Sequence, residues 1–156
     1  MAKETGMQRN WKLWAALLVV FGLGQLNPLG RAYLVLAEWK LPEIKQESLA
    51  QSPSPFEAIT PDKWVGESAN VFAVEDINPI APVHLLIIPK LRISNILEAS
   101  PELVAEMSAL ALKMARERGI DESGFRLVIN TNPHGGQTVY HMHMHLIGGR
   151  QMGWLG

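Results

Sequence analysis

The sequence contains no cysteine, which excludes disulfide bonds, thiolate metal sites and a cysteine nucleophile. It also has no excess of either charge, because 14 Lys and Arg residues face 15 Asp and Glu residues without a run of like sign. A groove for polymeric DNA or RNA normally presents a basic face, so we expect no nucleic-acid polymer as a partner. A mononucleotide needs only a few well-placed donors and stays a candidate ligand.

An uninterrupted apolar run of membrane-spanning length is missing as well. A span needs about 20 apolar residues, whereas the apolar N-terminal segment, residues 13–29, is broken by polar residues, glycines and a proline. Three interpretations stay open: a membrane span, a signal peptide whose basic region precedes residue 13, and a helical hairpin that turns at residues 27–30. Membrane contact through residues 13–29 is therefore a hypothesis.

Serine and proline are concentrated in residues 46–61. Prolines disfavour helix interiors and central strands, so this composition indicates a linker near a domain boundary. We expect residues 1–44 to form an apolar helical extension and residues 45–156 to form the main domain.

Hydrophobic patterning in the main domain predicts strands at residues 70–75, 84–88, 125–130 and 139–147. A helix is expected to begin after Ser100, whose hydroxyl can cap it, and to end near Gly119. Strands and helices do not alternate regularly. This order favours an α+β fold with an antiparallel sheet.

Three histidines alternate with apolar residues in the last of these strands. Side chains alternate between the two faces of a strand, so His141, His143 and His145 are expected on one face, roughly 7 Å apart in sequence order. Three interpretations compete: satisfied polar residues, a zinc site, and a nucleophilic site for phosphorus chemistry. Residues spaced in this way point in parallel rather than converging on one metal ion, which disfavours zinc. Imidazole titrates near neutral pH and can attack, donate or orient, and the adjacent Gly135-Gly136 offers backbone amides for a phosphate.

At this point the sequence resembles a known family. Residues 135–150, with the sequence GGQTVYHMHMHLIGGR, are similar to the histidine triad superfamily, whose motif is His-x-His-x-His followed by apolar residues. The nearest branch comprises the Hint-like purine nucleoside phosphoramidate hydrolases, and residues 76–90 and 150–154 also match it. The resemblance covers about Trp64 to the C-terminus. It implies an α+β fold with an antiparallel five-stranded sheet and a long helix, and a homodimer whose sheet has ten strands.

The resemblance also implies roles for individual residues. His143 matches the nucleophile that becomes nucleotidylated, while His141 and His145 match the flanking members that position it and contact the phosphate. His84 matches a fourth histidine that supports them. Thr138 stands where the family usually has serine, beside the leaving group, and keeps the hydroxyl.

Substrate contacts are implied in the same way. Asp76 matches a carboxylate that contacts the ribose hydroxyls. Apolar positions that help to hold the base are matched by Phe72 and Ile77. Asn130, Gly136 and Gln137 match residues that contact the substrate on the side of its phosphate. The resemblance implies neither a cofactor nor a metal.

We therefore expect a hydrolase that cleaves purine nucleoside 5'-phosphoramidates through a covalent nucleotidyl-histidine. The alternatives are a dinucleoside polyphosphate hydrolase, a metal-dependent enzyme, and a non-catalytic, membrane-associated nucleotide-binding regulator. A nucleotide substrate favours a cytoplasmic domain, joined to a membrane by a helical hairpin. The family's Trp-Pro-Pro-Gly ending is replaced here by residues 154–156, Trp-Leu-Gly, and this change bears on leaving-group preference.

Overall fold

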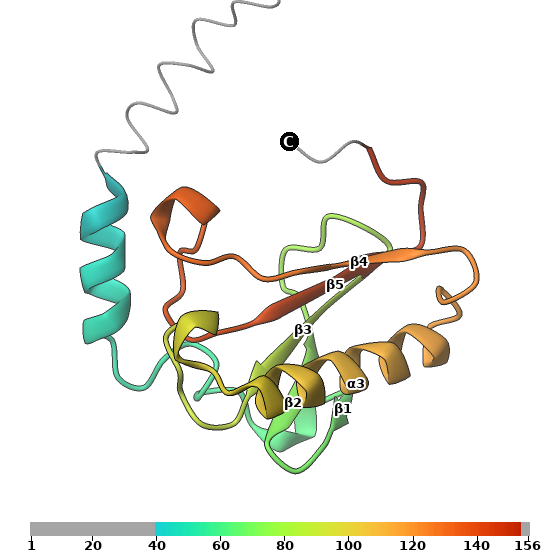
Figure 1. Cartoon of the computed structure of the whole chain (residues 1–156), viewed down its shortest axis with the longest axis horizontal. Helices are drawn as coiled ribbons and strands as arrows, with labels where there is room; N and C mark the ends of the chain where they lie inside the picture. Colours follow the sequence, from blue (N-terminus) through green and yellow to red (C-terminus); the bar gives the residue numbers. More distant parts are fainter. Residues whose placement is uncertain (1–39, 154–156) are drawn as a thin grey trace, which may run out of the picture. The chain divides into compact units, whose positions relative to one another are not determined.

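The computed structural model describes residues 40–153. Its centre is a five-stranded antiparallel sheet in the order β1-β2-β3-β5-β4 (Figure 1). The strands are β1 (Gly66–Glu67), β2 (Val71–Glu75), β3 (Val83–Pro89), β4 (Phe125–Val128) and β5 (Met144–Gly148). This architecture confirms the predicted fold class of the main domain.

One face of the sheet is covered by helix α3 (Pro101–Glu117), as Figure 1 shows. Ser100 caps the helix, since its hydroxyl oxygen accepts a hydrogen bond from the Leu103 amide at 3.2 Å. Beyond the helix Gly119 has φ +65°, a left-handed conformation that favours glycine after a helix end. Both predicted helix signals are therefore confirmed.

Alternation along β3 and β5 divides the interior into two clusters. Leu85, Ile87, Met144 and Leu146 face α3 and form the main core with Met107 and its neighbours. Side chains of the other phase face away from α3, and there Phe72, Val74, Leu86 and Ile88 pack with Phe56. The second face, which no long helix among the described residues covers, is the one that carries His84 and His145.

The predicted strand at residues 139–147 is too long, because β5 begins only at Met144. Residues 141–143 would otherwise extend the ladder along the end of β3, but Pro89 has no N–H with which to continue it. The Pro89 carbonyl accepts instead from Nε2 of His141 at 2.9 Å. His141 and His143 therefore lie in an irregular segment that precedes β5.

The linker interpretation of residues 46–61 is wrong for much of that segment. Residues 40–50 are helical, and Arg92 donates hydrogen bonds to the carbonyls of Ser48 and Gln51. Farther along, Ser54 and Phe56 are buried. The segment is thus packed against the domain, although the division of the chain after residue 44 stays a prediction.

Within residues 40–153, no helix combines the length and the apolar character needed to cross a bilayer. The apolar segment at residues 13–29, with its hairpin, span and signal-peptide interpretations, lies outside the described residues.

Candidate active site

The histidines are gathered on the sheet face opposite α3. His84 on β3 and His145 on β5 have ring centroids 5.2 Å apart, because Leu86 pairs with His145 and brings the two rings into diagonal register. His143 lies next, with its ring 5.0 Å from that of His145. His143 and His145, two of the three alternating histidines, are therefore gathered in one cluster with His84.

A chain of hydrogen bonds sets the protonation pattern of His84 and His145. The Ile80 amide donates to Nδ1 of His84 at 3.3 Å, so this nitrogen is an acceptor. The proton of a neutral His84 then sits on Nε2, which is 2.9 Å from Nδ1 of His145. His145 accepts there and carries its own proton on Nε2. That N–H is buried and has no partner.

His143 has the opposite pattern. Its Nδ1 is 2.8 Å from the carbonyl oxygen of His141, and a carbonyl can only accept. Nδ1 therefore carries the proton, and Nε2 of the neutral ring keeps a lone pair. Phe56 holds the ring edge-on, with centroids 5.0 Å apart. The ring of His143, with a bare nitrogen, is therefore a neighbour of the His145 ring, which carries an N–H, at 5.0 Å between centroids.

His141 uses both ring nitrogens within the protein. Nε2 donates to the Pro89 carbonyl, and Nδ1 is 2.7 Å from the hydroxyl of Ser54. The residue is 1% exposed. Its ring therefore has no nitrogen left for a phosphate, and this structure supports only the positioning half of its predicted role.

Burial sets the charge state of the triad. Desolvation lowers the pKa of His141 and of His143, and it lowers the pKa of His145 to about 4, where the neighbouring histidines add to the effect. All three rings are consequently neutral at pH 7. A neutral imidazole can attack or donate a hydrogen bond without first losing a proton.

The lowered pKa values predict a loss of stability in mild acid. A histidine in the unfolded chain takes up a proton near pH 6.5, whereas folded His145 does so at about 4. Between these values the unfolded state binds more protons, so acidification favours unfolding. We expect the melting temperature to fall between pH 6.5 and 5, above the range where carboxylates titrate. Circular dichroism can measure the melting temperature at each pH. His134→Ala, which removes an exposed loop histidine, is the control. A flat profile in the parent protein would contradict the prediction.

The loop of residues 130–138 places the other phosphate-side candidates. Gly136 is exposed and has φ +76°, and Thr138 is exposed beside it. Gln137 is 1% exposed, and its side chain bonds to the Asn132 amide and to the carbonyls of Ser94 and Val139. The Gln137 side chain therefore holds the loop in shape, and its backbone N–H donates to the Asn132 carbonyl at 3.2 Å. Asn130 is half-buried nearby.

The residues predicted to contact the base and the ribose do not all lie together in the structure. Phe72 stacks on Trp64 at 4.5 Å beside a pocket of about 200 Å³. Asp76 lies 3.4 Å from Nε2 of His84 and also accepts from the Asn78 amide. Ile77, in contrast, is 92% exposed and does not line this pocket. The structure therefore brings Phe72 and Asp76 to the site but leaves Ile77 in solvent.

Several residues of this site were missed by sequence reasoning. Ser54, Phe56 and Ile59 come from the serine- and proline-rich segment, and Trp64 follows it. The apolar spacing of Phe56 and Ile59 within a polar stretch was the available signal, because isolated apolar residues there have no partner in a free linker.

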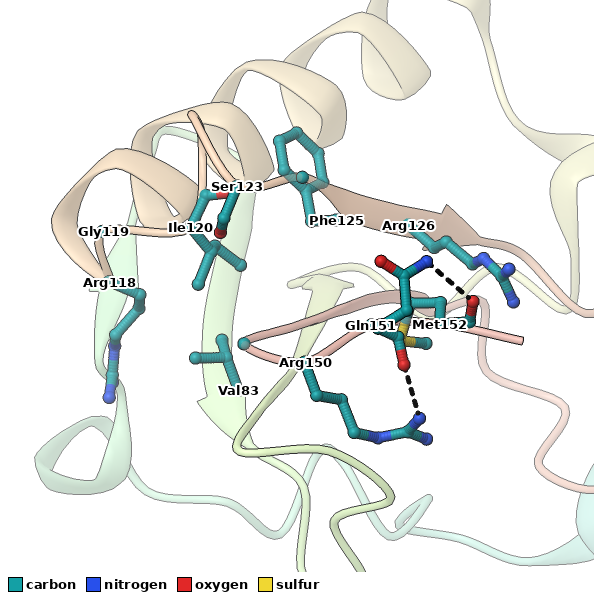
Figure 2. Close-up of a pocket in the computed structure, with 12 residues that line it drawn as sticks. Val83, Arg118, Gly119, Ile120, Ser123, Phe125, Arg126, Arg150, Gln151 and Met152 are labelled. Atoms are coloured by element: carbon teal, nitrogen blue, oxygen red, sulfur yellow. Dashed lines mark hydrogen bonds between the residues drawn. The ribbon is translucent and has the colours of Figure 1, made fainter. Parts of the chain in front are cut away.

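A larger cavity of about 700 Å³ lies elsewhere, between the end of α3, β4 and residues 149–152 (Figure 2). Arg118, Arg126 and Arg150 line it, and no histidine does. Arg150 donates to the carbonyls of Gln151 and Ile80, which connects this cavity to the turn that carries the Ile80 amide.

One group of possible metal ligands is present among the described residues. Ligand atoms of Asp76, His84 and His145 lie within 4.8 Å of one another. However, Nε2 of His84 and Nδ1 of His145 already bond to each other, so a metal would have to replace that bond. The expectation of metal-free chemistry stays a prediction.

Comparisons with known proteins extend these observations. A profile of the family described as HIT domain matches residues 57–152. The purine nucleoside phosphoramidase of Escherichia coli (strain K12) is 47% identical over 96 residues, which cover 60% of this chain and 81% of that protein. An adenylylsulfatase of Arabidopsis thaliana is 41% identical over 123 residues, covering 70% and 83%.

Solved structures show the same fold. A HIT family hydrolase from Legionella pneumophila Philadelphia 1 superposes with a TM-score of 0.60 at 47% identity, covering 64% of this chain and 96% of the other. A zinc-bound histidine triad family protein from Mycobacterium smegmatis has a TM-score of 0.55 at 31% identity, covering 66% and 77%.

Proposed function

Because this chain belongs to the HIT domain family, we propose that it hydrolyses purine nucleoside 5'-phosphoramidates through a nucleotidyl intermediate on His143. The observation that carries the proposal is the pairing of two neutral imidazoles. Nε2 of His143 has a lone pair, while Nε2–H of His145, 5.0 Å away between ring centroids, has no partner. A phosphoryl group between them would meet a nucleophile on one side and a hydrogen-bond donor on the other.

In the first step Nε2 of His143 attacks the α-phosphorus, the P–N bond breaks, and the amine leaves with its electron pair and takes up a proton from solvent. The His143 ring becomes positively charged as the new N–P bond forms. Its Nδ1–H already points at the His141 carbonyl, and that bond strengthens as the charge develops. We propose that the His145 N–H stabilises charge on a phosphate oxygen.

In the second step water attacks the same phosphorus and gives one proton back to solvent, and the N–P bond to His143 breaks. The products are the nucleoside monophosphate and the regenerated neutral ring. Over both steps one water is consumed and one amine is released. The hydroxyl of Thr138 is the proposed contact of the leaving group. The amides of Gly135, Gly136 and Gln137 already donate to carbonyls of the same loop, so a phosphate that binds there would replace one of those bonds.

The purine is proposed to occupy the aromatic pocket. Phe56 connects the pocket to the nucleophile, because it lines the cavity and also contacts the His143 ring. Ile59, Trp64 and Phe72 supply flat or apolar walls. Asp76, only 13% exposed at its side chain, is the proposed ribose contact.

Shortening one wall of this pocket should weaken substrate binding. Ile59 is half-buried, so Ile59→Ala removes apolar contact without emptying the core. We expect KM for adenosine 5'-phosphoramidate to rise about tenfold, the equivalent of roughly 1.4 kcal/mol of lost burial, with little change in kcat. Steady-state kinetics measure both constants. Leu112→Ala is the matched control, because Leu112 is an exposed residue of α3. An unchanged KM in Ile59→Ala would place the base elsewhere.

A rate comparison tests the function itself. We expect release of AMP from adenosine 5'-phosphoramidate to be much faster than cleavage of diadenosine polyphosphate, and to be unaffected by a strong chelator. Faster cleavage of the polyphosphate would establish the alternative hydrolase. Tight AMP binding without turnover of any phosphoramidate would establish a nucleotide-binding regulator. Loss of activity with chelator, restored by zinc, would establish a metal-dependent enzyme.

We also propose a homodimer. In the described sheet β4 is an edge strand, and Leu127 on it is 37% exposed. If the β4 strands of two protomers pair, the free backbone N–H and C=O groups of both β4 edges are hydrogen-bonded, and the two sheets form one sheet of ten strands. Light scattering on the purified chain measures the mass directly.

A cytoplasmic location and membrane contact through residues 13–29 stay predictions, which fractionation can test.

A further inference from the structure

Among the described residues, the shortest side-chain hydrogen bond of a triad histidine is made with a serine outside the triad. Oγ of Ser54 lies 2.7 Å from Nδ1 of His141, and both residues are 1% exposed. The two are 87 positions apart in the chain. Because water is excluded from this contact, whichever group donates the proton determines the form of the His141 ring.

The direction of that bond follows from the other partners of the ring. Nε2 of His141 is 2.9 Å from the Pro89 carbonyl, which can only accept, so Nε2 carries a proton. Burial keeps the ring neutral by lowering its pKa. The Pro89 hydrogen bond and the Glu57 carboxylate oppose this lowering, whereas Arg92 and His143 add to it. Nδ1 of a neutral ring is then bare. The Ser54 hydroxyl must donate.

A short turn between Ser54 and Glu57 orients the Ser54 hydroxyl. The Ser54 amide donates to Oε2 of Glu57 at 2.6 Å, and the Glu57 amide donates back to Oγ of Ser54 at 3.3 Å. Oγ therefore accepts from one side and has one proton left to give. These reciprocal bonds leave His141 as the partner of the hydroxyl proton.

The way in which His141 is held also affects His143, the proposed nucleophile. With one nitrogen bonded to Ser54 and the other to Pro89, the His141 ring is held at both ends, and its backbone carbonyl is held with it. That carbonyl is the acceptor for Nδ1–H of His143. If the His141 ring is no longer held at both ends, its backbone carbonyl can shift, and His143 then loses the bond that keeps its Nε2 bare.

We propose that Ser54 is a positioning residue of this site: its hydroxyl holds His141 as the neutral Nε2–H form, and thereby keeps the nucleophilic nitrogen of His143 unprotonated. This inference rests on the proposed function for its kinetic consequence. Its structural content, the position of the proton on each ring, does not depend on any substrate.

Two measurements on the full chain test the proposal. Long-range ¹H–¹⁵N correlation spectra report which nitrogen of each of the five histidines is protonated. We expect His141 to be protonated on Nε2 and His143 on Nδ1. In Ser54→Ala we expect a mixed tautomer at His143 and at least a tenfold loss of kcat, about the effect of one hydrogen bond, with KM nearly unchanged. Ser54→Thr keeps the hydroxyl and should restore most of the rate.

Ser52→Ala is the matched control, because Ser52 is exposed two residues away. A parent spectrum with His141 protonated on Nδ1, or His143 on Nε2, overturns the proposal even if Ser54→Ala does not fold. A folded Ser54→Ala protein with parental kcat and tautomers also overturns it. Absence of phosphoramidate turnover in the parent would refute the proposed function alone, since the spectra still decide the role of Ser54.

Discussion

Replacing His143 with alanine is expected to abolish phosphoramidate hydrolysis, with a loss of about 10⁴-fold or more in kcat. Nε2 of this ring is the proposed attacking atom, and removal of a nucleophile leaves only the contribution of binding and hydrogen bonding to the rate. Initial rates of AMP release from adenosine 5'-phosphoramidate measure the effect. Because His143 is 8% exposed, thermal melts are needed to show that His143→Ala is folded.

The same substitution should remove the covalent intermediate. When the parent protein is mixed with substrate and quenched in alkali, which preserves phosphorylated imidazole, mass spectrometry is expected to find one nucleotidyl group on the peptide that contains His143. His143→Ala should carry none. His134→Ala is the control, since His134 is exposed in a neighbouring loop and should keep both the rate and the adduct. Parental turnover by a folded His143→Ala protein would end the assignment.

Patterning predicted the parts of the fold that depend on near neighbours in the chain. The alternation of residues 142–146 buries Met142, Met144 and Leu146 in the core beneath α3 and leaves His145 on the other face. Ser100 and Gly119 bound the helix as expected. Each of these features follows from a period or a cap that a few consecutive residues specify.

Features that depend on distant residues could not be predicted in this way. The shortened β5 reflects Pro89, which lies on another strand and removes the donor that the ladder would need. The contact between Ser54 and His141 joins a segment whose composition resembles a linker to the centre of the site. The position of each proton on the imidazoles depends on backbone groups such as the Ile80 amide, which no side-chain pattern records.

The bond between His84 and His145 predicts a second large effect. His145→Ala removes the unpartnered N–H that we propose as a donor to the phosphate, and loss of such a donor typically lowers kcat by about 10²–10³-fold. His84→Ala leaves Nδ1 of His145 without the donor that sets its tautomer, since Nε2 of His84 lies 2.9 Å from it. An indirect effect of this kind is expected to be smaller, about tenfold to 100-fold.

A double-mutant cycle separates this relay from two independent roles. If His84 acts through the His145 ring, the double variant should be hardly slower than His145→Ala alone, because the group that His84 orients is already gone. His134→Ala combined with His145→Ala is the comparison pair, whose effects should multiply, since His134 lies outside the site. If the losses multiply in the His84–His145 pair, His84 serves the reaction by another route. Its 3.4 Å contact with Asp76 is one candidate.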